Sequence, residues 1–157
     1  MKRYCIDEEQ AEQMKNGFQD VGKWVFYLLK AARTANIPWS VLREGITKTG
    51  AYDAYALYPR TNDLKELAAA VSESDMVKAY DGRILSVDDH SMKLELCSNP
   101  MMQMAQSCTD DDLFLRELAD AYLCVFRGIF ETYGLRCETL ETSDSGYGCA
   151  VLTVSRG

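Results

Sequence analysis

The feature that most constrains the fold is a long stripe of apolar side chains between residues 110 and 133. Apolar residues recur there at steps of three and four, the spacing of one face of an α-helix. The stripe consists of Leu115, Leu118, Tyr122, Val125 and Ile129, and it is widened by Phe126, Phe130 and Tyr133. Gly134 ends the predicted helix, and the aspartates at 110 to 112 suit the dipole of its first turn. We expect this face to pack on a sheet and to form the main core.

Strands are predicted on both sides of this helix. Residues 83–88 and 92–97 flank the turn "DDHS", and residues 135–141 and 147–155 flank the turn "SDSGYG". In 92–97, Met92, Leu94 and Leu96 alternate with polar residues, as in a strand with one buried face. Each pair predicts a hairpin, and together they predict an antiparallel sheet of about four strands.

The first half of the chain predicts helices. One covers residues 7–35, a second starts at Pro38 and ends at Gly50, and a third covers 61–74. Short helical turns are expected in "PMMQMAQ" at 100–106. The order of helices, hairpin, long helix and hairpin predicts an α+β fold, in which a helical layer packs on the antiparallel sheet. The length of 157 residues suits a single domain over residues 1–157.

Composition restricts the partners and the location. The chain carries 24 acidic and 17 basic side chains, a net charge of −7, without a basic patch. We therefore expect no nucleic-acid partner and no membrane partner. No apolar run reaches the roughly 18 to 20 residues that cross a bilayer, and the N-terminus lacks the apolar core of a secretory signal. These features predict a cytoplasmic location, in which the six cysteines are thiols.

The sequence predicts no cofactor. It contains neither GxxxxGK[ST] nor GxGxxG, which disfavours nucleotide binding. The cysteine spacings match no zinc-finger pattern. His90, the only histidine, lies in the turn "DDHS", where we expect it to be exposed to solvent. Cys5 and Cys124 are interpreted as structural.

Two cysteines flank a methionine-rich segment. Cys97 ends a predicted strand and faces away from its leucines. Cys108 immediately precedes the predicted helix of 110–133, a position that lowers a thiol pKa, whereas the aspartates that follow raise it. A reactive thiolate and an inert thiol both remain open for Cys108. The methionines between the cysteines either line a soft ligand pocket or fill a core, and Asp111 and Asp112 can serve acid–base catalysis only in a desolvated cleft.

The segments "LELCSNP", "SCTDDD" and "TLETSDSGYGCAVLTV", in this order, resemble the L-2-amino-thiazoline-4-carboxylic acid hydrolase family. More distantly they are similar to vinyl-reductase-like (4VR) small-ligand domains. In the first half, "VGKWVFYLLKAARTANIPWSVLREGITKTG" resembles the family's amphipathic helix and the helix after it. The resemblance implies a helical layer on a four-stranded antiparallel sheet, with a small-molecule pocket between the two.

The resemblance also implies a site. It suggests that Cys97, Cys108 and Cys149 converge on the pocket, where a thiolate attacks an amidine-like carbon or three thiolates hold a metal. The implied substrate-binding residues are Asp112, Asp144, Tyr147 and Met101. Two function classes follow. One is a hydrolase that opens a C–N bond in a small heterocyclic amide or amidine, such as a thiazoline carboxylate. The other is a non-catalytic small-molecule binder or sensor of the 4VR type, for which a homodimer is an option.

Overall fold

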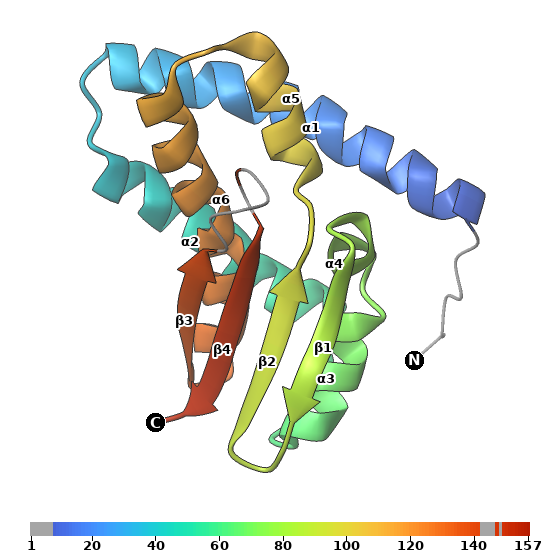
Figure 1. The fold of residues 1–157 in the computed structure, drawn as a ribbon. Coiled ribbons are helices and arrows are strands. Elements are labelled where there is room, and N and C mark those ends of the chain that lie inside the picture. The colour runs from blue at the N-terminus through green and yellow to red at the C-terminus, as the bar shows by residue number, and fades with distance from the viewer. Residues whose placement is uncertain (1–7, 142–146, 148) are drawn as a thin grey trace.

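The computed structural model describes residues 8–141, 147 and 149–157. In chain order its helices and strands are α1 (Glu8–Thr34), α2 (Trp39–Leu57), α3 (Leu64–Ser72), α4 (Asp75–Ala79), β1 (Gly82–Val87), β2 (Ser91–Leu96), α5 (Pro100–Cys108), α6 (Asp112–Thr132), β3 (Leu135–Glu141) and β4 (Ala150–Arg156). The strands form one antiparallel sheet in the order β1-β2-β4-β3, and helices pack on one of its faces (Figure 1). The predicted α+β fold is confirmed.

The sheet buries one face through strict alternation. In β2 and β4, Leu94, Leu96, Leu152 and Val154 are at most 1% exposed, whereas Lys93, between the buried Met92 and Leu94, is exposed. The register pairs Leu96 with Ala150 at one end of these strands and Ser91 with Ser155 at the other. The predicted strands are confirmed, except that the last begins at Ala150 rather than at residue 147.

The long helix α6 contributes to two cores rather than one. Its second half packs on the sheet through Leu123, Phe126, Ile129 and Phe130. Its first half places Leu115, Leu118 and Tyr122 against Phe26 of α1 and Met102 of α5. The expectation that the whole stripe packs on the sheet is therefore wrong for this half. At 21 residues the helix is about 32 Å long, whereas a seven-residue strand spans about 23 Å, so α6 extends past the sheet.

Glycines bring α2 and α6 into close contact. A Cβ atom on Gly50 would lie 1.8 Å from the Val125 carbonyl oxygen, and one on Gly128 would lie 1.9 Å from the Thr47 carbonyl oxygen. Only glycine permits this backbone approach. The prediction that α2 ends at Gly50 is therefore wrong, because this glycine serves packing and the helix continues to Leu57.

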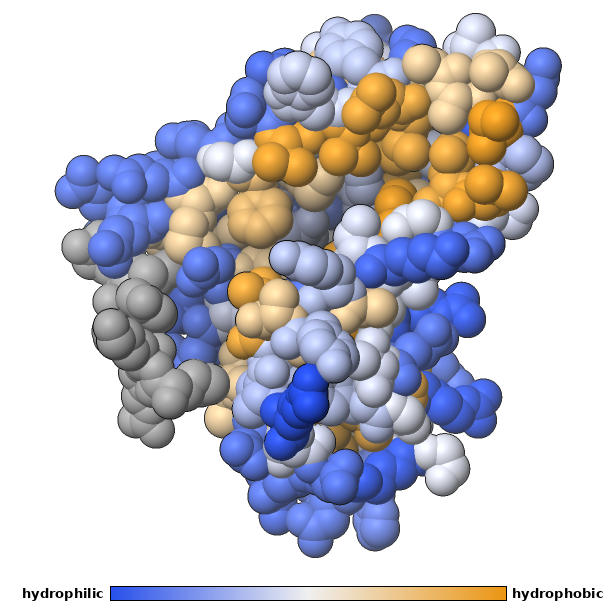
Figure 2. All heavy atoms as spheres, turned by 180° about the vertical axis from the view of Figure 1, so that it is seen from behind, coloured by the Kyte–Doolittle hydropathy of each residue, from blue (hydrophilic) through white to orange (hydrophobic). Residues whose placement is uncertain are grey.

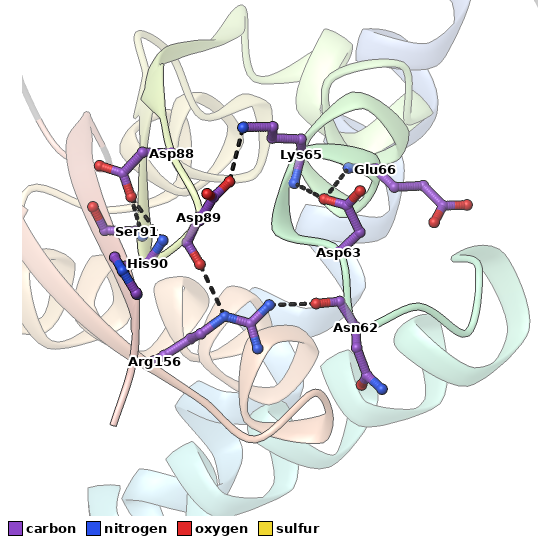
Figure 3. A network of polar contacts seen from close by, with 9 residues as sticks. All are labelled: Asn62, Asp63, Lys65, Glu66, Asp88, Asp89, His90, Ser91 and Arg156. Atoms are coloured by element: carbon purple, nitrogen blue, oxygen red, sulfur yellow. Dashed lines mark hydrogen bonds and ion pairs between the residues drawn. The ribbon is translucent and has the colours of Figure 1, made fainter.

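The β1–β2 turn is built from short polar contacts. The Asp88 carboxylate accepts hydrogen bonds from the backbone N–H groups of His90 (2.7 Å) and Ser91 (2.8 Å), which lower its pKa (Figure 3). The residue at 90 is exposed, as predicted. The only histidine of the chain therefore lies at a surface turn.

The same turn is tied to α3 and to the end of β4. Lys65 forms an ion pair with Asp89 (2.8 Å), and Arg156 donates to the carbonyl oxygens of Asp89 and Asn62 (Figure 3). These contacts join three segments that are distant in sequence.

No helix in the described part of the chain is long and apolar enough to span a membrane.

Candidate functional site

The segment between β2 and α5 carries a buried amide that is only half satisfied. Asn99 is 2% exposed and caps α5, because its Oδ1 accepts from the backbone N–H groups of Met101 (3.1 Å) and Met102 (3.3 Å). These two bonds fix the orientation of the side chain. Its Nδ2 group is buried and has no hydrogen-bond partner within the part of the chain that the structure describes.

A second buried polar group lies on α6. Tyr122 is 3% exposed, and its hydroxyl has no hydrogen-bond partner among the described residues. Burial raises the pKa of Tyr122, with smaller contributions from Tyr80 and Cys108, so the hydroxyl stays protonated. Tyr122 packs in the same cluster as Met102, whose N–H group bonds to Asn99. The two unsatisfied groups therefore border one cluster.

The hydroxyl of Tyr80, which lies near Tyr122, has only a weak hydrogen bond. Tyr80 is buried, and its hydroxyl donates to the Met101 sulfur at 3.6 Å, a weak acceptor. Its ring packs edge-to-face on Phe126, with centroids 5.7 Å apart. Met101 lies close to α1, because a Cβ on Gly22 would be 2.8 Å from the Met101 Cα. Met101 therefore connects α1, α5 and Tyr80, and it is partly buried.

Two of the three predicted cysteines meet at this end of the sheet. The Cys149 thiol donates to the Cys97 carbonyl oxygen at 2.8 Å, and the Cys97 N–H donates to the Tyr80 carbonyl oxygen at 3.2 Å. The Cys97 side chain is exposed, as alternation predicts. Partial burial, and then the Glu95 carboxylate, raise the pKa of its thiol. Cys149 is buried and lies immediately before β4, which starts at Ala150.

Cys108 lies elsewhere. It is the last residue of α5 and not the start of α6, since Asp111 caps α6. The prediction that Cys108 immediately precedes the helix of 110–133 is therefore wrong. The predicted short turns are instead a nine-residue helix, which rises about 12 Å and separates Cys108 from Cys97. A hydrogen bond with the Cys108 thiol raises the pKa of Tyr27 on α1.

No group of three or more His, Cys, Asp or Glu side chains is placed to hold a metal ion within residues 8–141, 147 and 149–157. The structure thus joins Cys97 with Cys149, but it does not bring Cys97, Cys108 and Cys149 together as a metal-binding group. Cys124 is buried in α6, and its thiol donates to the Asp120 carbonyl oxygen at 3.6 Å.

The remaining predicted site residues lie at the start of α6. The Tyr147 hydroxyl donates to Asp112, and Arg116 pairs with Asp112 at 2.8 Å. These two contacts lower the pKa of Asp112, whose side chain is 61% exposed. An exposed carboxylate that stays ionised does not suit acid–base catalysis in a desolvated cleft. Asp144 lies outside the described residues.

Two open hollows on the surface lie away from these residues. One, of about 420 Å³, lies between the ends of α2 and α6, and the other, of about 450 Å³, lies between α3 and β1. Neither is lined by a predicted site residue.

The sequence matches no family model and no curated protein. The resemblance described above is therefore carried by its motifs alone, and the candidate site is defined by its geometry.

Sequence reasoning missed the two groups that define the site. Tyr122 belongs to the apolar stripe predicted for 110–133, and Asn99 lies just before the short helical turns expected at 100–106. The signal was present for Tyr122, because a tyrosine in an otherwise apolar stripe brings a hydroxyl that needs a partner when buried. No comparable signal marks Asn99, since its burial depends on how α5 docks.

Proposed function

We propose that the protein binds a small organic molecule through the Tyr122 hydroxyl and the Asn99 amide. The observation that carries this proposal is that both groups are almost fully buried and have no partner in the described part of the chain. A buried polar group without a hydrogen bond costs about 1–3 kcal/mol. A ligand that supplies the bonds removes this cost on binding.

The chemistry of the two groups defines the ligand class. An amide NH₂ and a protonated phenol are neutral donors, so the ligand must bring an acceptor oxygen or nitrogen. The surrounding cluster contains Phe26, Met101 and Met102, which suit an apolar body. The net charge of −7 disfavours an anion. A small, mostly apolar molecule with a carbonyl or amide oxygen fits these conditions best.

The protonation state of the Cys97 thiol favours binding over hydrolysis. A cysteine nucleophile acts as the thiolate, but partial burial and Glu95 raise the pKa of Cys97. The hydrolase that opens a cyclic amide or amidine remains the second candidate, supported by the motif resemblance and by the contact between Cys149 and Cys97. A cytoplasmic location belongs to the same proposal, because the free thiols of Cys97, Cys108 and Cys124 suit a reducing compartment.

A matched pair of probes tests the binding proposal. Acetophenone and ethylbenzene have similar size, but only acetophenone carries a carbonyl acceptor. Ligand-observed NMR should detect acetophenone binding that exceeds ethylbenzene binding and that falls at least about fivefold in Tyr122→Phe, the loss of one hydrogen bond.

Tyr58→Phe is the matched control. Tyr58 is also a buried tyrosine whose hydroxyl has no hydrogen-bond partner among the described residues, but it packs in the sheet core and not in the cluster of Tyr122. Burial raises its pKa to about 12, against an opposing effect of the Ser74 hydroxyl. Affinity should be unchanged in this variant. Equal binding of the two probes, or equal losses in both variants, would contradict the proposal.

A separate assay addresses the hydrolase. The parent protein and the serine variants of Cys97, Cys108 and Cys149 are incubated with 2-amino-thiazoline-4-carboxylate, and ring opening is followed by chromatography. The binding proposal predicts no ring opening above the rate in buffer. Ring opening that Cys97→Ser abolishes would replace the binder with the hydrolase.

A further inference from the structure

The outer face of α1 is an apolar surface without a partner in the described part of the chain. Val21, Trp24 and Leu28 are 51%, 65% and 65% exposed. From behind, hydrophobic side chains gather on the side of the molecule where α1 lies (Figure 2). The inward face of the same helix is distinct, since it buries Gly22 and Phe26 against α5 and α6. The exposed residues are therefore not needed for the core.

The exposed residues have the spacing of a coiled-coil seam. Gly17, Val21, Trp24, Leu28 and Ala31 follow one another at steps of four, three, four and three, and all five are exposed. A 4-3 repeat keeps one apolar line facing a second helix. We call these five residues the α1 seam. At 27 residues, α1 is about 40 Å long, enough for such a pairing.

Charge on α1 selects the orientation of the second helix. Residues 8–20 contain Glu8, Glu9, Glu12, Asp20 and Lys15, a net charge of −3, and residues 21–34 contain Lys23, Lys30 and Arg33, a net charge of +3. A second copy of α1 in antiparallel orientation places each acidic half beside a basic half. A parallel copy places like charges together.

The seam is also self-complementary in this orientation. When Val21 of one copy lies opposite Trp24 of the other, Leu28 lies opposite Gly17. Apart from the local backbone of α1, no heavy atom of the described residues lies within 4 Å of a Cβ built on Gly17, so a leucine has space there. Asp20 and Lys23 flank the seam and pair with each other at 2.8 Å, which leaves no unpaired charge at its centre.

We propose that two copies of this chain associate through the α1 seam, with their α1 helices antiparallel. The interface is isologous, because every contact occurs twice about a two-fold axis. Trp24 lies at its centre, where a large aromatic side chain contributes most to association.

The test measures the oligomeric state of the full chain by sedimentation velocity and light scattering. The parent should be a dimer that dissociates on dilution. Trp24→Glu and Leu28→Glu should each raise the dissociation constant about 30-fold or more, the effect of removing a central contact. Tyr52→Glu is the matched control, because Tyr52 is an exposed aromatic residue (72%) on α2, outside the seam, and its dimer should be unchanged. Circular dichroism checks that the variants are folded.

Ionic strength tests the orientation. Antiparallel α1 helices attract, so added salt should weaken the dimer, whereas parallel helices would give a dimer that salt strengthens. A parent that is monomeric at every concentration, or a dimer that survives Trp24→Glu, would overturn the proposal. Binding of the parent to phosphatidylcholine–phosphatidylglycerol vesicles that Trp24→Glu abolishes, without a dimer, would assign the seam to a membrane surface instead.

Discussion

The two ends of the sheet treat polar groups in opposite ways. At the β1–β2 turn, Asp88, Asp89 and Arg156 are exposed and each has a partner within hydrogen-bond distance (Figure 3). At the opposite end, where Leu96 pairs with Ala150, Asn99 and Tyr122 are buried and lack partners among the described residues. Exposed groups are satisfied by water in any case, so partners at the turn add little stability.

The unsatisfied donors of Asn99 and Tyr122 lower the free energy of unfolding, and no contact within the described residues offsets this loss. A buried donor without a partner destabilises the protein, and replacement of tyrosine by phenylalanine would remove that cost at Tyr122. Two such donors, Asn99 and Tyr122, border one cluster at this end of the sheet, which favours a role in binding for this end and a structural role for the turn.

The largest effect is expected from removing the core beneath the unsatisfied end. Leu118 is fully buried in the cluster that contains Tyr122. Leu118→Ala should lower the free energy of unfolding by about 2–5 kcal/mol, because it leaves a cavity. Denaturant unfolding measures the change. Leu113→Ala on the same helix, at a position that is 72% exposed, should change it by less than about 0.5 kcal/mol. Equal effects would mean that this end has no core of its own.

A smaller effect, of opposite sign, is expected at the unsatisfied hydroxyl. Tyr122→Phe removes a buried hydroxyl without a partner, so the free energy of unfolding should rise by about 1 kcal/mol. Tyr58→Phe should give a similar gain, because the buried Tyr58 hydroxyl also has no hydrogen-bond partner among the described residues. Both are measured by denaturant unfolding in the absence of ligand. A loss of stability in Tyr122→Phe would show that its hydroxyl already has a partner in the folded chain.

The smallest effect is expected at the turn and depends on pH. The N–H groups of His90 and Ser91 hold the pKa of Asp88 below its ordinary value of 3.8. A depressed pKa means that the carboxylate stabilises the fold above the ordinary value and loses this effect as the pH falls through the folded-state value. The melting temperature of Asp88→Asn should therefore fall less steeply than that of the parent below about pH 4. If the melting temperatures of the two proteins fell equally with pH, Asp88 would not contribute to the pH dependence of stability.

The sequence predicts the sheet well because alternation in β2 and β4 depends only on which face is buried. It fails where backbones approach closely. Gly50 has the pattern of a helix end, but the close approach of the Val125 carbonyl oxygen on another helix leaves no room for a Cβ there, and no local pattern reveals that contact. The position of Cys108 is wrongly predicted for a related reason. The length of α5 depends on how α5 packs against α1 at Gly22. The candidate site could be predicted only in part, because Cys97 and Cys149 meet through strand pairing, whereas Tyr122 and Asn99 depend on burial.

The central claim is that Tyr122 and Asn99 are donors to a ligand. A crystal structure of the protein soaked with acetophenone tests this most directly. The account predicts density for the ligand with its carbonyl oxygen about 2.7–3.2 Å from the Tyr122 hydroxyl or the Asn99 Nδ2. Ordered water on both groups, with the ligand absent or bound only in the hollow between the ends of α2 and α6, would contradict it.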